Sequence, residues 1–196
     1  MCGRFNIDPT PTKMRAILDA LGPQASLIKT GDIYPGDVAP VLALATEGME
    51  ARAMSWGFPR WDGRGVVFNA RAETALVKPM FRKALRACPV VVPTTGFYEW
   101  KTVPGSRKKE KYLFRREGEA ILYLAGFAEN LEPPRLGVTQ CFTILTTDAN
   151  ESMAPYHDRM PLLLAAEECD AWLSGQGREK FLGRIPFAVQ AKAADV

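Results

Sequence analysis

The residue with the most distinctive chemistry is the second one, Cys2. Initiator methionine is commonly removed before a small side chain, and the mature chain would then begin with a cysteine that carries both a free α-amine and a thiol. An α-amine is partly unprotonated near neutral pH, whereas a lysine amine is almost fully charged. Such an amine can condense with an aldehyde to an imine, and the thiol can then close onto the imine carbon as a thiazolidine ring.

Cys2 alone leaves several interpretations open. It can be a small apolar residue near the start of the chain. It can be the aldehyde-trapping aminothiol, or the nucleophile of an N-terminal-nucleophile hydrolase whose amine acts as the base. The opening Met-Cys-Gly is also similar to that of class II glutamine amidotransferases, whose terminal cysteine attacks glutamine.

Two polar side chains, Asn69 and Arg71, lie two positions apart in a predicted strand over Val66–Arg71. Side chains at that spacing leave a strand by the same face. An amide beside a guanidinium suits the binding of a sugar and its phosphate, because arginine can donate two charge-assisted hydrogen bonds to an oxyanion. A surface strand with an exposed polar face is the alternative.

Glu99 lies among the aromatic residues Phe97, Tyr98 and Trp100 in another predicted strand. An inward side chain at this position would favour the protonated carboxyl. Imine formation needs a group that helps water to leave and that accepts a proton from the amine, and one carboxyl can do both. A glutamate that alternates outward toward water is the alternative.

The chain contains a single histidine, His157, the residue type that titrates nearest to neutral pH. It lies in a predicted loop before a strand over Met160–Leu164, and a loop position favours function over packing. Asp158 and Arg159, which follow it, either orient the imidazole or contact phosphate. A purely structural histidine and a structural salt bridge are the alternatives.

Three helices are predicted among the elements that position these residues. The first is capped by Thr10, has Pro11 in its first turn and ends at Gly22. The second runs over Pro79–Ala87 and the third over Glu167–Leu173. The side chains expected to face inward are Met14, Ile17, Leu18 and Leu21 in the first helix and Met80, Phe81 and Leu85 in the second.

Most of the remaining chain is predicted to form short strands rich in Val, Thr, Phe and Tyr, separated by turns at 16 glycines and 15 prolines. Besides the strands already given, they are Val38–Ala45, Ala51–Trp56, Val90–Val92, Gly96–Lys101, Lys111–Arg116, Ala120–Phe127 and Gln140–Thr147. Strict β-α-β alternation is missing. The pattern predicts a β-rich α+β domain with a mixed sheet or partly closed barrel and a few peripheral helices.

Composition limits the class of protein. With 196 residues, 47% of them hydrophobic and 24% charged, the chain is typical of one soluble domain over residues 1–196. A net charge of +3 allows nucleic acid as a partner without requiring it. The apolar stretches are too short for a membrane span and no secretory signal is visible, so we expect a cytoplasmic protein, associated with the nucleoid if it is bacterial. We also expect a monomer. Four cysteines without a C-x-x-C pair, and one histidine, predict no disulfide, metal or cofactor.

Several motifs, in their order and separation, resemble the SRAP family, the so-called SOS-response-associated peptidases, through most of the chain. They are Met1-Cys2-Gly3-Arg4-Phe5, Val38-Ala39-Pro40, Trp56-Gly57-Phe58, Phe68-Asn69-Ala70-Arg71-Ala72-Glu73-Thr74, Gly96-Phe97-Tyr98-Glu99-Trp100, Thr143-Ile144-Leu145-Thr146-Thr147 and His157-Asp158-Arg159-Met160-Pro161. The resemblance implies an SRAP-like fold and a protein that covalently traps abasic sites in single-stranded DNA through a thiazolidine at Cys2. The resemblance also allows lyase activity and autopeptidase activity.

The resemblance also assigns roles to the catalytic residues. Cys2 forms the crosslink, and Asn69 positions the cysteine and the abasic sugar. Glu99 transfers protons near the terminal amine. His157 promotes the ring-opened aldehyde form of the sugar and governs reversal of the crosslink, while Arg71 holds phosphate.

The residues expected to contact DNA are Arg4, Pro40, Trp61, Arg71 and Arg159. Pro40 and Trp61 are expected to act as apolar wedges or stacking platforms, and a stacked base contributes about 1–3 kcal/mol. Trp56 is expected to lie in the core instead. The basic segment 106–111 is either a solvated hairpin tip or a phosphate-contacting loop.

Some positions depart from the family pattern, and two rival functions stay open. Gly36-Asp37 stands where the family commonly has Tyr-Asn, Pro79 where relatives can carry a basic residue, and the tail after Leu182 is short. A thiol hydrolase, either an autoprocessing peptidase or a glutamine amidase, could use the same Cys2 and Glu99. A non-catalytic module for single-stranded DNA would bind in a strongly salt-dependent way and leave no covalent species.

Overall fold

The computed structural model describes residues 2–46, 48–105, 108–131 and 137–194. Two sheets dominate it, and β5 (Phe58–Pro59) and β6 (Val66–Val67) form a third, two-stranded sheet. The smaller main sheet has the strand order β15-β10-β9-β1-β2. Its strands are β1 (Phe5–Ile7), β2 (Gly31–Ile33), β9 (Gly96–Thr102), β10 (Lys109–Arg115) and β15 (Gln190–Ala193).

The larger sheet has the order β13-β12-β4-β3-β8-β11-β14, with β7 paired to β12. Its strands are β3 (Val38–Ala45), β4 (Gly48–Trp56), β7 (Asn69–Arg71), β8 (Pro89–Thr94), β11 (Leu122–Glu129), β12 (Cys141–Asp148), β13 (Arg159–Pro161) and β14 (Leu163–Leu164). An additional pairing of β11 with β12 closes five of these strands into a ring, and β12 runs parallel to both β4 and β7. The prediction of a β-rich α+β fold with a mixed sheet or partly closed barrel is therefore confirmed.

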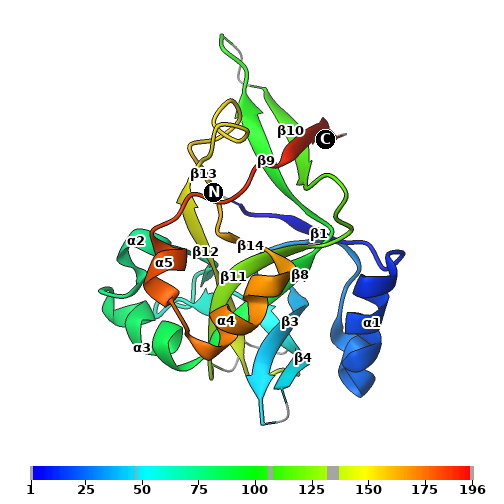
Figure 1. The fold of residues 1–196 in the computed structure, drawn as a ribbon, viewed down its shortest axis with the longest axis vertical. Coiled ribbons are helices and arrows are strands. Elements are labelled where there is room, and N and C mark those ends of the chain that lie inside the picture. Colours follow the sequence, from blue (N-terminus) through cyan, green and yellow to red (C-terminus); the bar gives the residue numbers. More distant parts are fainter. Residues whose placement is uncertain (1, 47, 106–107, 132–136, 195–196) are drawn as a thin grey trace.

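The helices are few and lie around the sheets, as Figure 1 shows. They are α1 (Thr12–Ala20), α2 (Ala72–Ala75), α3 (Pro79–Ala87), α4 (Cys169–Ser174) and α5 (Arg178–Leu182), with 3-10 turns at Gly22–Leu27 and Ala166–Glu168. In the view of Figure 1, α1 lies on the right, and α2, α3 and α5 lie on the left. Among the described helices, none combines the length and apolar character that a bilayer crossing would require.

The predicted elements differ from the observed ones mainly at their ends. The helix over Pro79–Ala87 has the predicted bounds, but Met80 is 51% exposed instead of facing inward, because Phe81 and Leu85 define the buried side. Thr10 does not cap α1; its hydroxyl bonds to Asp8, and Pro11 occupies the cap position.

Two predicted strands are each divided in two. The stretch Val66–Arg71 forms β6 and β7 in different sheets, and the stretch Met160–Leu164 falls within β13 and β14. In the second case β13 pairs with β12 while β14 pairs with β11. One short apolar segment can thus pair with two different strands, and its sequence alone does not show where the first pairing ends and the second begins.

Candidate active site

Cys2 is held at the start of the smaller sheet. The strand that follows it, β1, pairs with β9 so that Phe5 lies opposite Phe97, and the backbone N–H of Tyr98 donates to the carbonyl oxygen of Arg4 at 2.9 Å. This register brings the residues before β1 beside the continuation of β9, where Glu99 lies. The Cys2 side chain is fully buried within the main apolar core. Met1 lies outside the described residues.

Trp56, predicted to be a core residue, is fully buried and joins the two sheets near Cys2. Its ring centroid lies 4.8 Å from that of Phe5 and 5.7 Å from that of Phe68. Its indole N–H donates to the carbonyl oxygen of Phe68 at 3.0 Å. Because Phe5 follows Cys2 closely and Phe68 precedes Asn69, this one tryptophan fixes both candidate residues.

Asn69 contacts the backbone of Cys2 directly. Its side-chain amide donates to the carbonyl oxygen of Cys2 at 2.8 Å, across 67 positions of sequence. Asn69 is half-buried and Arg71 is exposed, whereas Ala70 between them is buried. The two polar side chains therefore leave β7 away from the core, which is the orientation that their spacing predicts.

Glu99 is buried, with 3% of its surface exposed. Burial and the nearby charge of Glu99 raise the pKa of the Cys2 thiol well above its usual range. The thiol is therefore protonated at neutral pH. This pair is the chemically significant feature of the site: a neutral thiol beside a buried carboxyl group.

His157 ends the turn that joins β12 to β13, and this turn packs on β10. The Tyr156 ring lies 4.6 Å from the ring of Tyr112 and 5.2 Å from that of Phe114. Tyr112 pairs with Glu99 across β9 and β10, so the two side chains share a face of the sheet. The turn that carries His157 therefore covers the Glu99 face.

The imidazole of His157 is half-buried and has partners at Nδ1. The backbone N–H of Arg159 donates to Nδ1 at 2.9 Å, and Oδ1 of Asp158 lies 2.7 Å from the same nitrogen. A neutral ring that accepts from Arg159 carries its proton on Nε2. A protonated ring can instead donate from Nδ1 to Asp158.

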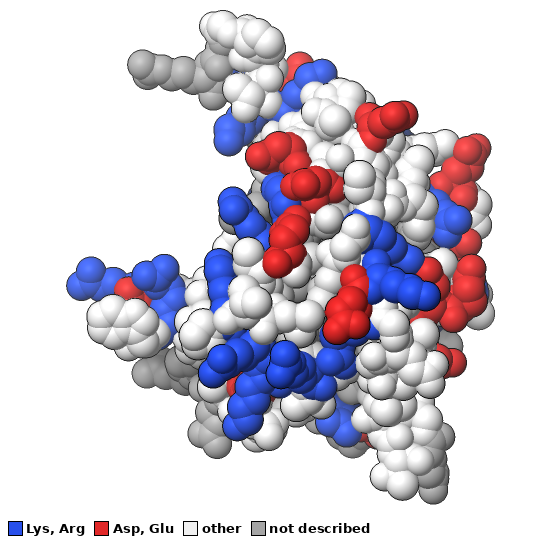
Figure 2. All heavy atoms as spheres, turned by 60° about the vertical axis from the view of Figure 1, so that its left-hand side comes forward, with Lys and Arg blue, Asp and Glu red and all other residues white. Residues whose placement is uncertain are grey.

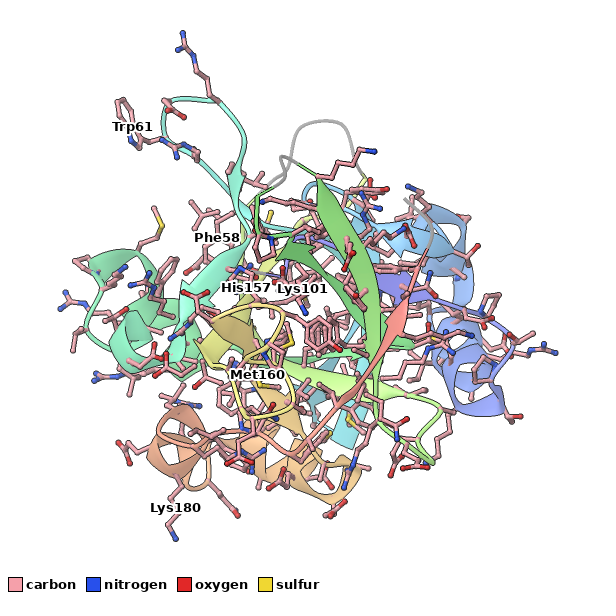
Figure 3. All side chains as sticks on the ribbon, turned by 90° about the horizontal axis from the view of Figure 1, so that it is seen from above. Phe58, Trp61, Lys101, His157, Met160 and Lys180 are labelled. Atoms are coloured by element: carbon pink, nitrogen blue, oxygen red, sulfur yellow. The ribbon has the colours of Figure 1, made fainter. Side chains whose placement is uncertain are left out.

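Lys101 is a site neighbour that the sequence reasoning missed. Its ammonium lies 5.3 Å from the centre of the Tyr156 ring, and Figure 3 shows Lys101 beside His157. The available signal was the strand period, since Lys101 follows Glu99 by two positions and hence shares its face.

Arg159 is engaged inside the protein. Its guanidinium donates to both carboxylate oxygens of Glu73 at 2.7 and 3.0 Å, to Asp148 at 2.5 Å and to the carbonyl oxygen of Thr146 at 2.8 Å. These bonds hold the pKa of Glu73 below its usual range. The geometry fits the salt-bridge alternative, and a phosphate would have to compete with three acceptors.

Arg4 points to the other face of the smaller sheet. Its guanidinium lies 4.5 Å from the ring centre of Tyr34 and 4.9 Å from that of Trp100, and it pairs with Asp32 at 3.4 Å. Trp100 alternates with Glu99 along β9, so Arg4 and Glu99 lie on opposite faces. This placement counts against a phosphate contact by Arg4 at the reacting centre.

The two expected stacking residues differ in exposure. Pro40 is buried within β3, opposite Ala53 of β4, so the expected wedge is not at the surface, and this burial counts against that role. Trp61 is 93% exposed on the loop between β5 and β6, which stands out from the body of the protein in Figure 3. Of the basic segment 106–111, residues 106 and 107 lie outside the described part.

The face that carries the β9–β10 hairpin is hollowed beneath the hairpin tip in Figure 2, and lysine and arginine side chains gather on it. Within the described ranges, no group of His, Cys, Asp and Glu side chains is arranged to hold a metal ion. The site brings together Cys2, Asn69 and Glu99, with the His157 turn packed over the face that carries Glu99.

Comparison with known proteins gives one family. The profile described as SOS response associated peptidase (SRAP) matches residues 1–191. The chain is 32% identical over 185 residues to the abasic site processing protein YoaM of Bacillus subtilis, covering 89% of this chain and 79% of that protein. It is 27% identical over 179 residues to the abasic site processing protein YedK of Escherichia coli, covering 88% of this chain and 79% of that protein.

Solved structures show the same fold. A structural-genomics protein from Bacteroides thetaiotaomicron superposes with a TM-score of 0.80 at 24% identity, covering 99% of this chain and 92% of that one. A protein from Bordetella bronchiseptica also gives a TM-score of 0.80 at 24% identity, covering 100% of both chains. The chain therefore has the same fold as these two solved structures.

Proposed function

Because the chain belongs to the SOS response associated peptidase (SRAP) family, we propose that it processes abasic sites in DNA by forming a covalent thiazolidine at Cys2. The observation that carries this proposal is the convergence of Asn69 and Glu99 on Cys2 from separate strands. The relatives in Bacillus subtilis and Escherichia coli are named abasic site processing proteins, which supports the class of substrate. The proposed substrate form is single-stranded DNA.

The reaction begins after removal of Met1, when the Cys2 amine attacks the aldehyde carbon of the ring-opened sugar. A carbon–nitrogen bond forms, and the carbinolamine then loses water to give an imine. Glu99 donates the proton that leaves with the water and takes a proton from the amine, so it is regenerated. His157 assists opening of the sugar ring and the later reversal.

Ring closure follows when the Cys2 sulfur bonds to the imine carbon and its proton passes to the nitrogen. The carbon then carries both hetero atoms, and neither oxidant nor reductant is required. Asn69 supports this geometry by holding the Cys2 carbonyl at 2.8 Å, which limits rotation of the aminothiol. Loss of the aldehyde removes the acidifying carbonyl that β-elimination needs, so the adduct shields the strand from cleavage.

The raised pKa of the Cys2 thiol favours this order of steps. A thiolate is the form that attacks an amide or ester, and burial beside Glu99 opposes it. An amine-first reaction needs only a neutral thiol at the outset.

The DNA is proposed to be held by Arg71 at phosphate and by Trp61 through stacking. Arg71 is exposed and is the last residue of β7, the strand that begins with Asn69. Trp61 exposes an aromatic face that can stack on any base, so little sequence preference is expected.

The test is incubation of the purified protein with a single-stranded oligonucleotide that contains one abasic site. We expect a species that survives denaturing electrophoresis and whose mass equals protein plus DNA minus one water. Intact mass should show that the active protein lacks its initiator methionine. A wild-type protein that binds this DNA but yields no covalent species would contradict the proposal.

Two variants sharpen the result. Cys2→Ala retains an amine but lacks the thiol, so it should form only an imine with the DNA. Heating should release the DNA from this imine, whereas reduction with borohydride should make the link permanent. Cys88→Ala, at a half-buried cysteine away from Cys2, is the matched control and should crosslink like the wild type.

A further inference from the structure

One surface is unusually basic, namely the stretch from the end of β7 through α3. Between residues 71 and 88 the sequence has five cations and one acid, Glu73, and Arg159 binds that acid. The five cations are all exposed; they are Arg71, Lys78, Arg82, Lys83 and Arg86. Figure 2 turns the side of the molecule that carries α2 and α3 toward the viewer, and it shows a group of lysine and arginine side chains, in blue, on that side.

The α3 cations form a row. Lys78, Arg82 and Arg86 are four residues apart, so they lie above one another on the helix, about 6 Å apart per step. Their helix is fixed by its opposite side, where Phe81 and Leu85 are buried. The row therefore has a rigid support.

These charges have no counterions within the described part of the protein. None of the ion pairs there includes Lys78, Arg82, Lys83 or Arg86. Another cation, Arg178, even bonds to the carbonyl oxygen of Arg86 at 3.5 Å, and burial together with the charge of Arg86 lowers its pKa. Clustered like charges destabilise a free surface, and a polyanion would relieve their repulsion.

We propose that this row on α3, together with Arg71 of β7, binds the phosphate backbone of DNA that flanks the lesion. The inference rests on the proposed function, since β7 and α2 connect Asn69 of the site to α3 with only a turn at residues 76–78 between the two helices. The row leads away from the reacting centre, so it would bind nucleotides beyond the abasic sugar. Val77 and Met80, 71% and 51% exposed beside these cations, offer apolar contact to sugars or bases.

The test compares Arg82→Gln/Arg86→Gln with a charge-matched control, Lys13→Gln/Arg15→Gln. The control residues are exposed on α1, across the molecule from α3 in Figure 1. Affinity is measured by fluorescence anisotropy over a range of salt, on oligonucleotides with a reduced abasic site that cannot crosslink. The DNA is extended on either side of the lesion, as a single strand or as duplex.

We expect the slope of log K against log salt to be shallower for the α3 variant by about 1.4, which is roughly 0.7 for each of two lost phosphate contacts. Between 50 and 200 mM salt its affinity should then fall about sevenfold less than that of the wild type. The α1 control should keep the wild-type slope, and the α3 variant should lose the gain in affinity from longer DNA. If the variant loses the gain on the single-stranded extension, the row binds single-stranded DNA. If it loses the gain on the duplex extension, the row binds duplex.

Identical slopes for wild type, α3 variant and control would overturn the inference. Its failure is distinguishable from failure of the proposed function, because covalent yield is measured separately on a short abasic oligonucleotide. The α3 variant should crosslink this short DNA normally. A wild type that fails to crosslink contradicts the proposed function, whereas a changed slope would still support the α3 surface.

Discussion

At the scale of single residues, the site depends on how its neighbours tune Cys2. Asn69 fixes the backbone of Cys2 through its carbonyl, and Glu99 opposes ionisation of the thiol. In the proposed reaction the same carboxyl group also transfers protons for the amine. The two effects make opposite predictions for a Glu99 variant, which allows the order of steps to be tested.

Glu99→Gln should lower the pKa of the Cys2 thiol toward its ordinary value, because the nearby negative charge is removed. Crosslinking should nevertheless slow by about 10²-fold or more, the usual contribution of a general acid–base group. Single-turnover time courses on denaturing gels measure the rate. Glu167→Gln, which removes an exposed carboxyl group from the 3-10 turn at Ala166–Glu168, is the control and should leave the rate unchanged. A faster reaction in Glu99→Gln would favour attack by the thiolate.

At the scale of elements, two features support the residues that surround the site. Arg159 ties α2 to β12 and β13 through Glu73 and Asp148. The arm formed by β5 and β6 carries Trp61, and it starts at Gly57. Both features are structural supports for residues that the proposal places against DNA.

Arg159→Gln should lower the free energy of unfolding by about 1.5–3 kcal/mol, because it removes charge-assisted bonds from a side chain that is nearly buried. Arg71→Gln should leave stability unchanged and should weaken salt-dependent DNA binding, with a slope shallower by about 0.7. Urea denaturation and anisotropy distinguish the two. If Arg159→Gln were as stable as the wild type but bound DNA poorly, the phosphate role would stand instead.

Gly57→Ala should destabilise the base of the Trp61 arm by roughly 1–3 kcal/mol. Gly57 has φ +113°, and an added Cβ would meet Val66 side-chain atoms at 2.5 and 2.6 Å. Gly63→Ala, at the tip of the same arm, is the control, since φ is +67° there and no atom lies within 4 Å of the new Cβ. Chemical denaturation should give the larger loss for Gly57→Ala; equal losses would contradict the steric explanation.

At the scale of the whole molecule, the site lies where the two sheets meet. The smaller sheet supplies Cys2 and Glu99, whereas the larger sheet supplies Asn69 and the turn of His157. A second apolar cluster, formed by the larger sheet and its helices, buries two further thiols. Burial raises the pKa of Cys141 to about 11 and that of Cys169 to about 12.

Stability should therefore decline in alkaline solution. Above about pH 9.0 the unfolded chain loses thiol protons that the folded protein retains, so the free energy of unfolding falls as the pH rises toward 11. Cys141→Ala should reduce the slope of the free energy of unfolding against pH by an amount that corresponds to at most about one proton per molecule. Urea titrations between pH 8 and 10.5 measure the slope. The same slope in Cys141→Ala and wild type would mean that this thiol ionises equally well in the folded state.

The sequence by itself determined the chemical identities and the local geometry of the site. The position of Cys2, the strand period of Asn69 and Arg71, and the bounds of the helix over Pro79–Ala87 follow from residue type and spacing. These features depend on neighbours within a few residues, so local rules are sufficient.

Only the tertiary structure decided which side chains meet. The bond from Asn69 to Cys2 spans 67 positions, the Arg159–Glu73 bond spans 86, and the burial of Pro40 depends on the strands beside β3. Strand pairing over such separations is set by the packing of the whole core around residues such as Trp56, and local sequence patterns do not encode it.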